Sequence, residues 1–281
     1  MLDPLAIVGV LAAAVLYLRG VDALTRRGRH WRTGRTASYL AGLACVLVAL
    51  CSSLDRYEDV LFSAHALQHV LLGMVAPPFI VLGRPVTLAL QASSRPTQRR
   101  ILRVMHSAPV RVVTHPLVVW LIFSATLFAL YFTPLFELSL RHTWVHVLVH
   151  VHFLVAGVLF AAVALGVEPM PRTLPYAGRA LFAFSTVPVH ACIGLALVTG
   201  DTLLARGFYG HVHRLWGPGA LADQHSAGGI LWAAGDLFGV VLMLIVVAQW
   251  LRHEQLLAGR IDRRLAATPV KPDAALAEST E

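Results

Sequence analysis

The hydrophobic positions of the chain are gathered into long apolar runs, and these runs are regularly spaced and bounded by arginines. At 1.5 Å rise per residue, each run is long enough to cross the ~30 Å hydrocarbon core of a bilayer, given some tilt. The pattern therefore predicts a bundle of seven membrane-spanning helices. They are expected at about residues 2–19, 38–54, 60–82, 115–133, 142–166, 179–199 and 226–250.

The composition supports this interpretation. Of the 281 residues, 57% are hydrophobic and 14% are charged, whereas soluble domains carry about 25% charged residues. The deficit disfavours an oversized soluble core and predicts an all-α, polytopic membrane protein. The formal charge of +8 would suit a nucleic-acid partner. The basic residues fall in particular inter-span loops, however, so we expect membrane lipid and no nucleic acid as a partner.

The arginines also predict an orientation. They are concentrated in the loops after the first, third and fifth spans and in the segment after the seventh, and the alternate loops contain few. Because cytoplasmic loops carry an excess of Lys and Arg, the arginine-rich loops belong inside. We therefore expect the N-terminus outside and the C-terminus in the cytoplasm.

A single membrane domain is expected over residues 1–255. The first run lacks a basic leader and a small-residue cleavage site, so we interpret it as a retained span and not as a signal peptide. No internal repeat is evident, which argues against a two-halved transporter. Residues 256–281 are expected to form a cytoplasmic tail with a disordered end.

Histidines collect at one depth in three of the predicted spans. His65 and His69 lie in the outer half of the third span, and His146 and His150 lie in the outer half of the fifth. Residues four apart share a helix face, so each pair presents two imidazoles together. Counted from the outer ends of their spans, His69, His150 and His190 lie about 12–13 Å deep. This common level favours a metal or cofactor site that opens outward.

The seventh span adds a polar stripe. His225, Trp232 and Asp236 are seven and four residues apart, which places them on one helix face. An ionised carboxylate in the middle of a membrane is costly, so Asp236 is expected to face the bundle interior and to have a histidine partner. There it would orient a ligand histidine.

The donor set leaves the bound group open. Imidazole suits copper, zinc, iron and nickel, and Met74 or Cys51 would add a soft sulfur ligand for Cu⁺. A b-type haem held by facing histidines is the rival cofactor. A proton-coupled transporter that uses Asp236 and the histidines as a relay is a third hypothesis.

Two other classes are disfavoured by single residues. A retinal protein needs a membrane lysine, but Lys271 in the tail is the only lysine. A zinc protease needs a glutamate between its histidines, and "HALQH" has none.

The prolines predict bends in two of the histidine-bearing spans. Pro77 and Pro78 lie in the inner half of the third span, and Pro188 precedes His190 in the sixth. Each removes a backbone donor, so the two adjacent prolines are expected to bend or break the helix. They lie below the proposed site, so we expect them to shape the bundle and not to touch an ion.

Four stretches together resemble one family. "HALQHVLLGMVAPPFIVLGRPVTLAL", "HVHFLVAGVLFAAVALGVEPMPR", "STVPVHACIGLAL" and "ADQHSAGGILWAAGDL" resemble the third, fifth, sixth and seventh spans of CtaG-like cytochrome c oxidase assembly factors. The resemblance covers about residues 35–255. The positions that match the family's motifs are His65, Gln68, His69, His150, His152, His190, Asp223, His225, Trp232 and Asp236.

The resemblance implies a seven-span protein of the bacterial plasma (inner) membrane that helps to mature an aa-type cytochrome c oxidase. It further implies copper as the metal, an oxidase subunit as the partner, and no enzymatic reaction. The predicted metal ligands are His65, His69, His146, His150, His190 and His225. Their predicted supports in the cavity are Gln68, His152, Asp223, Trp232, Asp236 and Met74.

Overall fold

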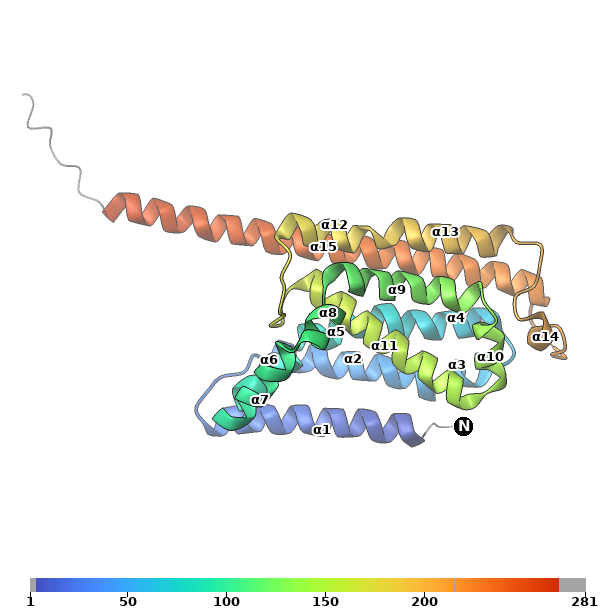
Figure 1. Ribbon diagram of the computed structural model, residues 1–281, viewed down its shortest axis with the longest axis horizontal. Helices are drawn as coiled ribbons and strands as arrows, with labels where there is room; N and C mark the ends of the chain where they lie inside the picture. The colour runs from blue at the N-terminus through green and yellow to red at the C-terminus, as the bar shows by residue number, and fades with distance from the viewer. Residues whose placement is uncertain (1–3, 215, 268–281) are drawn as a thin grey trace, which may run out of the picture.

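The computed structural model describes residues 4–214 and 216–267, and within these ranges every regular element is helical. The long helices run side by side as a bundle, with the short ones near its two ends (Figure 1). The first half contains α1 (Pro4–Arg26), α2 (Thr33–Cys51), α3 (Ser53–Tyr57), α4 (Phe62–Val70), the π-helix η1 (Leu71–Val75), α5 (Ala76–Leu82), α6 (Pro85–Ala92), α7 (Arg95–Met105) and α8 (Ala108–Val113). The second half contains α9 (Pro116–Tyr131), α10 (Leu135–Arg141), α11 (Thr143–Leu165), α12 (Tyr176–Phe184), α13 (Thr186–Thr199), α14 (Arg206–Tyr209) and α15 (Ala220–Ala267).

Six of the helical segments in the described chain are long and apolar enough to cross a membrane. The predicted fourth span differs. α9 and α10 are long and apolar enough to cross a membrane only when taken together, and their axes are bent by 73° at the break between them. The 16 residues of α9 extend about 24 Å, which is less than the hydrocarbon thickness of about 30 Å. Pro134 stands in the break between the two helices. The all-helical, multi-pass prediction is thus confirmed with six or seven spans.

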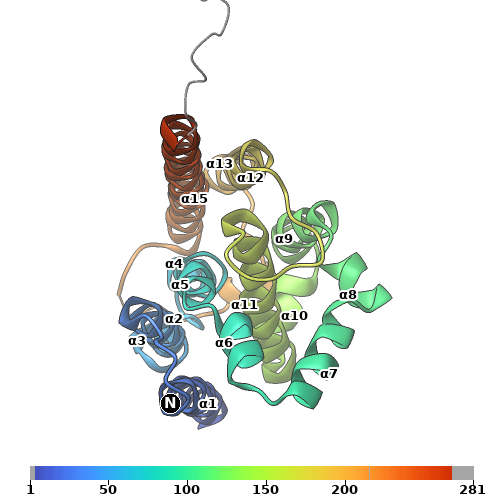
Figure 2. The same cartoon turned by 90° about the vertical axis from the view of Figure 1, so that its left-hand side faces the viewer.

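Two spans form the centre of the bundle. In its most apolar window, the segment Phe62–Ala92 has 61% of its residues buried and α11 has 56%, against 11% for α1. Seen along the bundle, α4, α5 and α11 are surrounded by α2, α9, α13 and α15 (Figure 2). Residues that point from α4 toward α11 therefore lie inside the bundle.

The two adjacent prolines do not break the third span. The chain passes from α4 through η1 into α5 without a gap, so the expected interruption is a π-helical turn. Pro77 and Pro78 have no N–H to donate to the turn before them, and a widened turn accommodates this loss. The turn also permits close packing, because a Cβ on Gly157 of α11 would collide with the carbonyl oxygen of Gly73.

The last span belongs to a helix much longer than the predicted 226–250. α15 has 48 residues, which corresponds to a length of about 72 Å. It begins before His225, so this histidine is helical, and it continues through the first part of the predicted tail to Ala267. The predicted disordered end, residues 268–281, lies outside the described residues.

The arginine-rich loops meet at one end of the bundle. Arg32, Arg84, Arg172 and Arg252 come from the four segments that were predicted to share a side of the membrane, and all four line one cavity. This end faces the viewer in Figure 2. The predicted topology requires these four segments to lie on the same side of the membrane, and the shared cavity agrees with this requirement. Which side of the membrane this end faces stays a prediction.

Candidate metal centre

Two pairs of histidines meet between the two central spans. His65 and His69 are one turn apart on α4, and His146 and His150 are one turn apart on α11. Across the helices, the ring centroids of His65 and His146 are 5.1 Å apart, and those of His69 and His150 are 5.5 Å apart. Within the pairs the centroids are 4.3 and 4.1 Å apart. The four imidazoles therefore form one continuous cluster.

The donor atoms of this cluster are close enough to share an ion. One donor atom each from His65, His69 and His146 lie within 4.8 Å of one another. The same holds for Glu58, His146 and His150. His146 belongs to both groups, so the two form one candidate site with five donor residues.

Glu58 is a member of the site that the sequence did not point to. It lies between α3 and α4, is 6% exposed, and places Oε1 3.5 Å from Nδ1 of His146. Burial raises the pKa of Glu58 to about 8, with a further contribution from Asp55 and Asp59 and an opposing one from the Gln68 amide. The signal available in the sequence was weak: a single carboxylate seven residues before His65, in a short loop between two apolar runs.

Several nitrogen and oxygen atoms of the candidate site are buried and have no hydrogen-bond partner among the described residues. This property tests whether the site fits a metal ion. Both ring nitrogens of His65 have no hydrogen-bond partner among the described residues, and the same is true of Nε2 of His69, His146 and His150 and of Oε2 of Glu58. A buried polar atom without a partner is unfavourable, and native proteins contain few of them. Several in one place fit a bound cation, because neutral imidazole nitrogen and carboxylate oxygen are metal ligands.

Aromatic rings cover the cluster, so the predicted outward-opening cavity is not what the structure shows. Phe136 of α10 lies edge-on to His65 at 5.3 Å and is tilted against Phe62 at 4.8 Å. Phe153 stacks on His69 at 4.3 Å. His65 and His69 are 0% and 1% exposed. The bend between α9 and α10 produces this cover, because it turns α10 back toward the bundle.

Asp223 holds the helix that carries the first histidine pair. Its carboxylate accepts hydrogen bonds from the backbone N–H of Phe62 at 2.7 Å and of Ser63 at 3.3 Å, and from the Ser63 hydroxyl at 2.5 Å. These are free donors at the N-terminus of α4, where a negative charge is also favourable. Arg214 pairs with the same carboxylate at 3.2 Å. Asp223 thus supports the site through the position of α4.

Gln68 and Tyr131 restrain the cluster from its sides. The Gln68 amide donates to the carbonyl oxygen of Ala49 in α2 at 3.0 Å. The Tyr131 hydroxyl lies 3.3 Å from Nδ1 of His69. If Nδ1–H donates to Tyr131, the lone pair of Nε2 is available for a metal, which is the usual arrangement around metal-binding histidines. Tyr131 was not predicted, and nothing in its local sequence distinguishes it from a packing residue.

Comparison with known proteins identifies the family. Residues 15–253 match the family described as cytochrome c oxidase caa3 assembly factors. The chain belongs to this family. No solved structure matches the chain significantly.

The curated relatives of this assembly-factor family member are longer proteins. An uncharacterized protein of Mycobacterium tuberculosis (strain CDC 1551 / Oshkosh) is 37% identical over 257 residues, which are 89% of this chain and 39% of the relative. An uncharacterized protein of Mycobacterium leprae (strain TN) is 34% identical over 264 residues, which are 92% of this chain and 40% of the relative. The chain therefore spans about two fifths of the length of the curated relatives it matches.

His190 packs against α15 next to Asp236 in this family member. Nδ1 of His190 lies 2.8 Å from the Thr186 carbonyl oxygen, and its ring lies against Gly235 of α15, where a Cβ would collide with the imidazole. Asp236 follows Gly235 on α15 and interacts electrostatically with His190, and among the described residues its buried Oδ1 has no hydrogen-bond partner. Asp236 thus has a histidine neighbour, but neither residue belongs to the donor groups among the described residues.

Two further predicted histidines bind to polar atoms elsewhere. Nε2 of His225 lies 3.1 Å from the carbonyl oxygen of Gly200. Nε2 of His152 lies 2.7 Å from the Thr126 hydroxyl, and this side chain is exposed on the far side of α11 from the cluster. Both stand outside the donor groups.

Met74 and Trp232 are packed as apolar residues. Met74 is buried and lines a small cavity with Phe123 and Phe153. Trp232 lies against Gly194 of α13, where a Cβ would collide with the tryptophan, and its side chain is partly exposed. Their predicted places near a metal remain predictions.

Proposed function

We propose that this protein helps to mature an aa-type cytochrome c oxidase in the bacterial plasma membrane, by binding copper at the histidine cluster and passing it to an oxidase subunit. Membership of the assembly-factor family supports the assembly role. The metal is supported by one observation above the others: four neighbouring histidines, three of them buried, and Glu58 hold buried nitrogen and oxygen atoms without hydrogen-bond partners among the described residues. The transfer of an ion converts no substrate, so no enzymatic role is proposed.

The donor chemistry suits a copper ion that is held and then released. Among divalent first-row metals, Cu²⁺ binds nitrogen and oxygen sites most strongly. Cys45, Cys51 and Cys192 stand outside the donor groups of the described residues. A site without thiolate holds Cu⁺ less tightly than a cysteine site would, and this favours transfer to another protein.

The edge formed by Glu58 and His146 is the proposed route for the ion. The side chains of His146 and Glu58 are 15% and 8% exposed, whereas His65 is fully buried. Asp55 and Asp59 stand beside Glu58 in the sequence and interact electrostatically with it. Clustered carboxylates raise the local concentration of cations, so they would guide copper toward this edge.

A b-type haem fits the cluster poorly. Haem iron bound by two histidines places the porphyrin between two imidazoles. The rings of His65 and His146 are 5.1 Å apart and those of His69 and His150 are 5.5 Å apart, with Phe153 stacked on His69. A porphyrin between these pairs would have to separate rings that are already packed together.

Metal analysis of the purified protein tests the proposal. In detergent, the full chain is expected to retain about one equivalent of copper after desalting and to show no Soret absorption. The double variant His65→Ala/His69→Ala is expected to lose most of this copper, because both residues belong to the donor groups. Expressed in place of the wild-type chain, the double variant should also lower the copper content of the purified oxidase.

A matched control separates the site from histidine content in general. His152→Ala removes an exposed histidine of α11 that lies outside the donor groups, so it should leave copper binding unchanged. Copper retained by the His65/His69 variant would refute the proposed site, and a Soret band in the wild-type protein would favour the haem hypothesis. Liposome flux that depends on Asp236 would favour the transporter.

A further inference from the structure

A basic cavity lies at the opposite end of the bundle from α3, α10 and α14, and the metal hypothesis does not account for it. It has a volume of about 800 Å³ and is lined by five arginines and His253. The arginines come from separate parts of the chain, namely the α1–α2 loop, the turn before α6, the loop after α11, α12 and α15. Its lining arginines are Arg32, Arg84, Arg172, Arg179 and Arg252.

No carboxylate lines this cavity among the described residues. The nearest acids have other partners. The Glu168 carboxylate accepts hydrogen bonds from the backbone N–H groups of Val86 and Thr87 at 2.9 and 3.0 Å. Glu254 accepts one from the Trp250 indole at 3.1 Å. Glu168 also interacts electrostatically with Arg84, so five arginines against this one carboxylate leave an excess of positive charge for a ligand to balance.

Arg179 shows that the cavity is more than a group of exposed loop arginines. Arg179 is 7% exposed, and its guanidinium carbon lies 4.2 Å from the centroid of the Tyr176 ring, over which it stacks. Nη1 donates to the carbonyl oxygen of Leu165 at the end of α11, which explains part of its burial. Nε is buried and has no hydrogen-bond partner in the part of the chain that the structure describes. A buried guanidinium with an unpaired N–H is a donor for an anion.

One of the lining arginines stands at a strained backbone position. Arg84 stands between Gly83 and Pro85 with φ of +54°, a left-handed conformation that non-glycine residues rarely adopt. The lining also contains apolar residues, among them Val163 of α11 and Val167 and Leu174 of the α11–α12 loop. A lining that combines arginines with apolar side chains suits a ligand with an anionic head and an apolar body.

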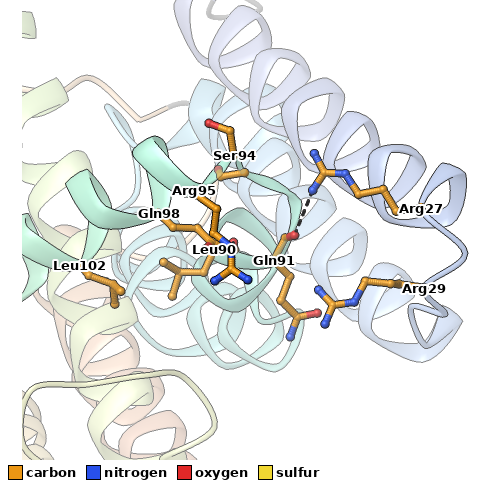
Figure 3. A pocket seen from close by; sticks show the side chains of 9 residues that line it. Arg27, Arg29, Leu90, Gln91, Ser94, Arg95, Gln98 and Leu102 are labelled. Carbon is orange, nitrogen blue, oxygen red and sulfur yellow. Dashed lines mark hydrogen bonds between the residues drawn. The ribbon is translucent and has the colours of Figure 1, made fainter.

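A second arginine-lined cavity provides a comparison. It lies between the end of α1 and helices α6 and α7, and its arginines are Arg27, Arg29 and Arg95 (Figure 3). All three are exposed, and Arg27 donates to the backbone oxygen of Gln91 at 3.4 Å. None of the arginines that line this cavity is buried. The ordinary excess of arginine in cytoplasmic loops would produce such a group of exposed arginines.

We propose that the cavity around Arg179 binds a phosphate group, carried either by an anionic phospholipid of the surrounding leaflet or by a soluble phosphate compound. A guanidinium group can donate two parallel hydrogen bonds to the oxygens of one phosphate. Basic pockets between membrane helices bind anionic lipid headgroups. The volume exceeds what a bare phosphate needs and lies within the range of small-molecule sites.

Binding to the purified full chain distinguishes the two sources. The delipidated protein in detergent is titrated with dioctanoyl phosphatidylglycerol, dioctanoyl phosphatidylcholine or inorganic pyrophosphate, and its thermal unfolding temperature is followed. A saturable rise with phosphatidylglycerol alone identifies a lipid site. A rise with pyrophosphate that competes with phosphatidylglycerol identifies a soluble phosphate ligand. No rise with either anion, or an equal rise with phosphatidylcholine, would overturn the proposal.

Paired variants assign the binding to this cavity. Arg172→Gln/Arg252→Gln removes two exposed lining arginines and leaves Arg179 to support α11. We expect at least about tenfold weaker binding, since each hydrogen bond to a charged group contributes roughly a factor of ten. Arg27→Gln/Arg95→Gln removes the same charge from the comparison cavity and should leave affinity unchanged. Equal losses in both variants would show nonspecific attraction and contradict the assignment.

Discussion

At the residue scale, three buried carboxylates differ in what they bind, and this difference identifies the one that is free for a metal. Asp223 caps α4, and Glu168 accepts hydrogen bonds from Val86 and Thr87 at the start of α6. Glu58 has a contact to His146, but its Oε2 has no hydrogen-bond partner within the described ranges of the chain. Two of the carboxylates therefore stabilise helix ends, and the third offers an oxygen to the histidine cluster.

We predict that Glu58→Gln weakens copper binding by about 10–100-fold without destabilising the metal-free protein. Glutamine keeps the shape of the side chain but removes the anionic ligand. Because burial raises the pKa of Glu58 to about 8, the metal-free protein carries it mostly as the neutral acid at pH 7, which glutamine resembles. Copper titration by competition with a chelator measures the affinity, and thermal unfolding of the metal-free protein measures the stability.

Asp59→Asn is the control for this prediction, since it removes a neighbouring exposed carboxylate that stands outside the donor groups. Its copper affinity should stay within about twofold of the wild type, because exposed charges near a site act weakly through solvent. Equal affinity in the Glu58 variant and the wild type would exclude Glu58 as a ligand.

At the element scale, the sequence predicted the depth of each histidine but not the direction in which its helix faces. His69, His150 and His190 were placed at one level by counting residues, and the first two do meet. His190 instead lies against Gly235, because α13 packs along α15. Rise along a helix follows from sequence position alone, whereas rotation about its axis depends on which neighbour it packs against. Glu58 and Tyr131 were missed for the same reason, since they reach the cluster from other elements.

The placement of α4 depends on its N-terminal cap, and this predicts the effect of removing it. Asp223→Ala should lower the free energy of unfolding by about 3–5 kcal/mol, because it leaves Arg214 buried without its partner and the first N–H groups of α4 unpaired. Unfolding in detergent micelles by added denaturant measures the change. Asp201→Ala, at an exposed acid in the same part of the chain, should change it by no more than about 0.5 kcal/mol. Similar stability in the two variants would refute the capping role.

At the scale of the whole molecule, hydropathy and charge predicted the helical bundle because both can be read along the chain without knowing its contacts. The structure has six or seven candidate spans, and the arginine-rich loops meet at one end of the bundle. The bend at Pro134 and the cover that α10 forms over His65 were not predicted, because residues 134–141 were interpreted as a loop. Such a cover depends on contacts between Phe136 and distant residues, which the local sequence does not specify.

The orientation of the bundle is the prediction that connects the two proposed sites. If arginine-rich loops lie in the cytoplasm, the histidine cluster lies toward the outer side and the basic cavity toward the inner leaflet. In a variant whose three cysteines are replaced by alanine, Asp201→Cys should react with a membrane-impermeant maleimide in intact spheroplasts. Gln98→Cys on α7 should react only after the membrane is permeabilised. The parent variant without cysteines controls for background labelling. The reverse pattern would place the histidine cluster on the cytoplasmic side, and copper would then have to be loaded from the cytoplasm.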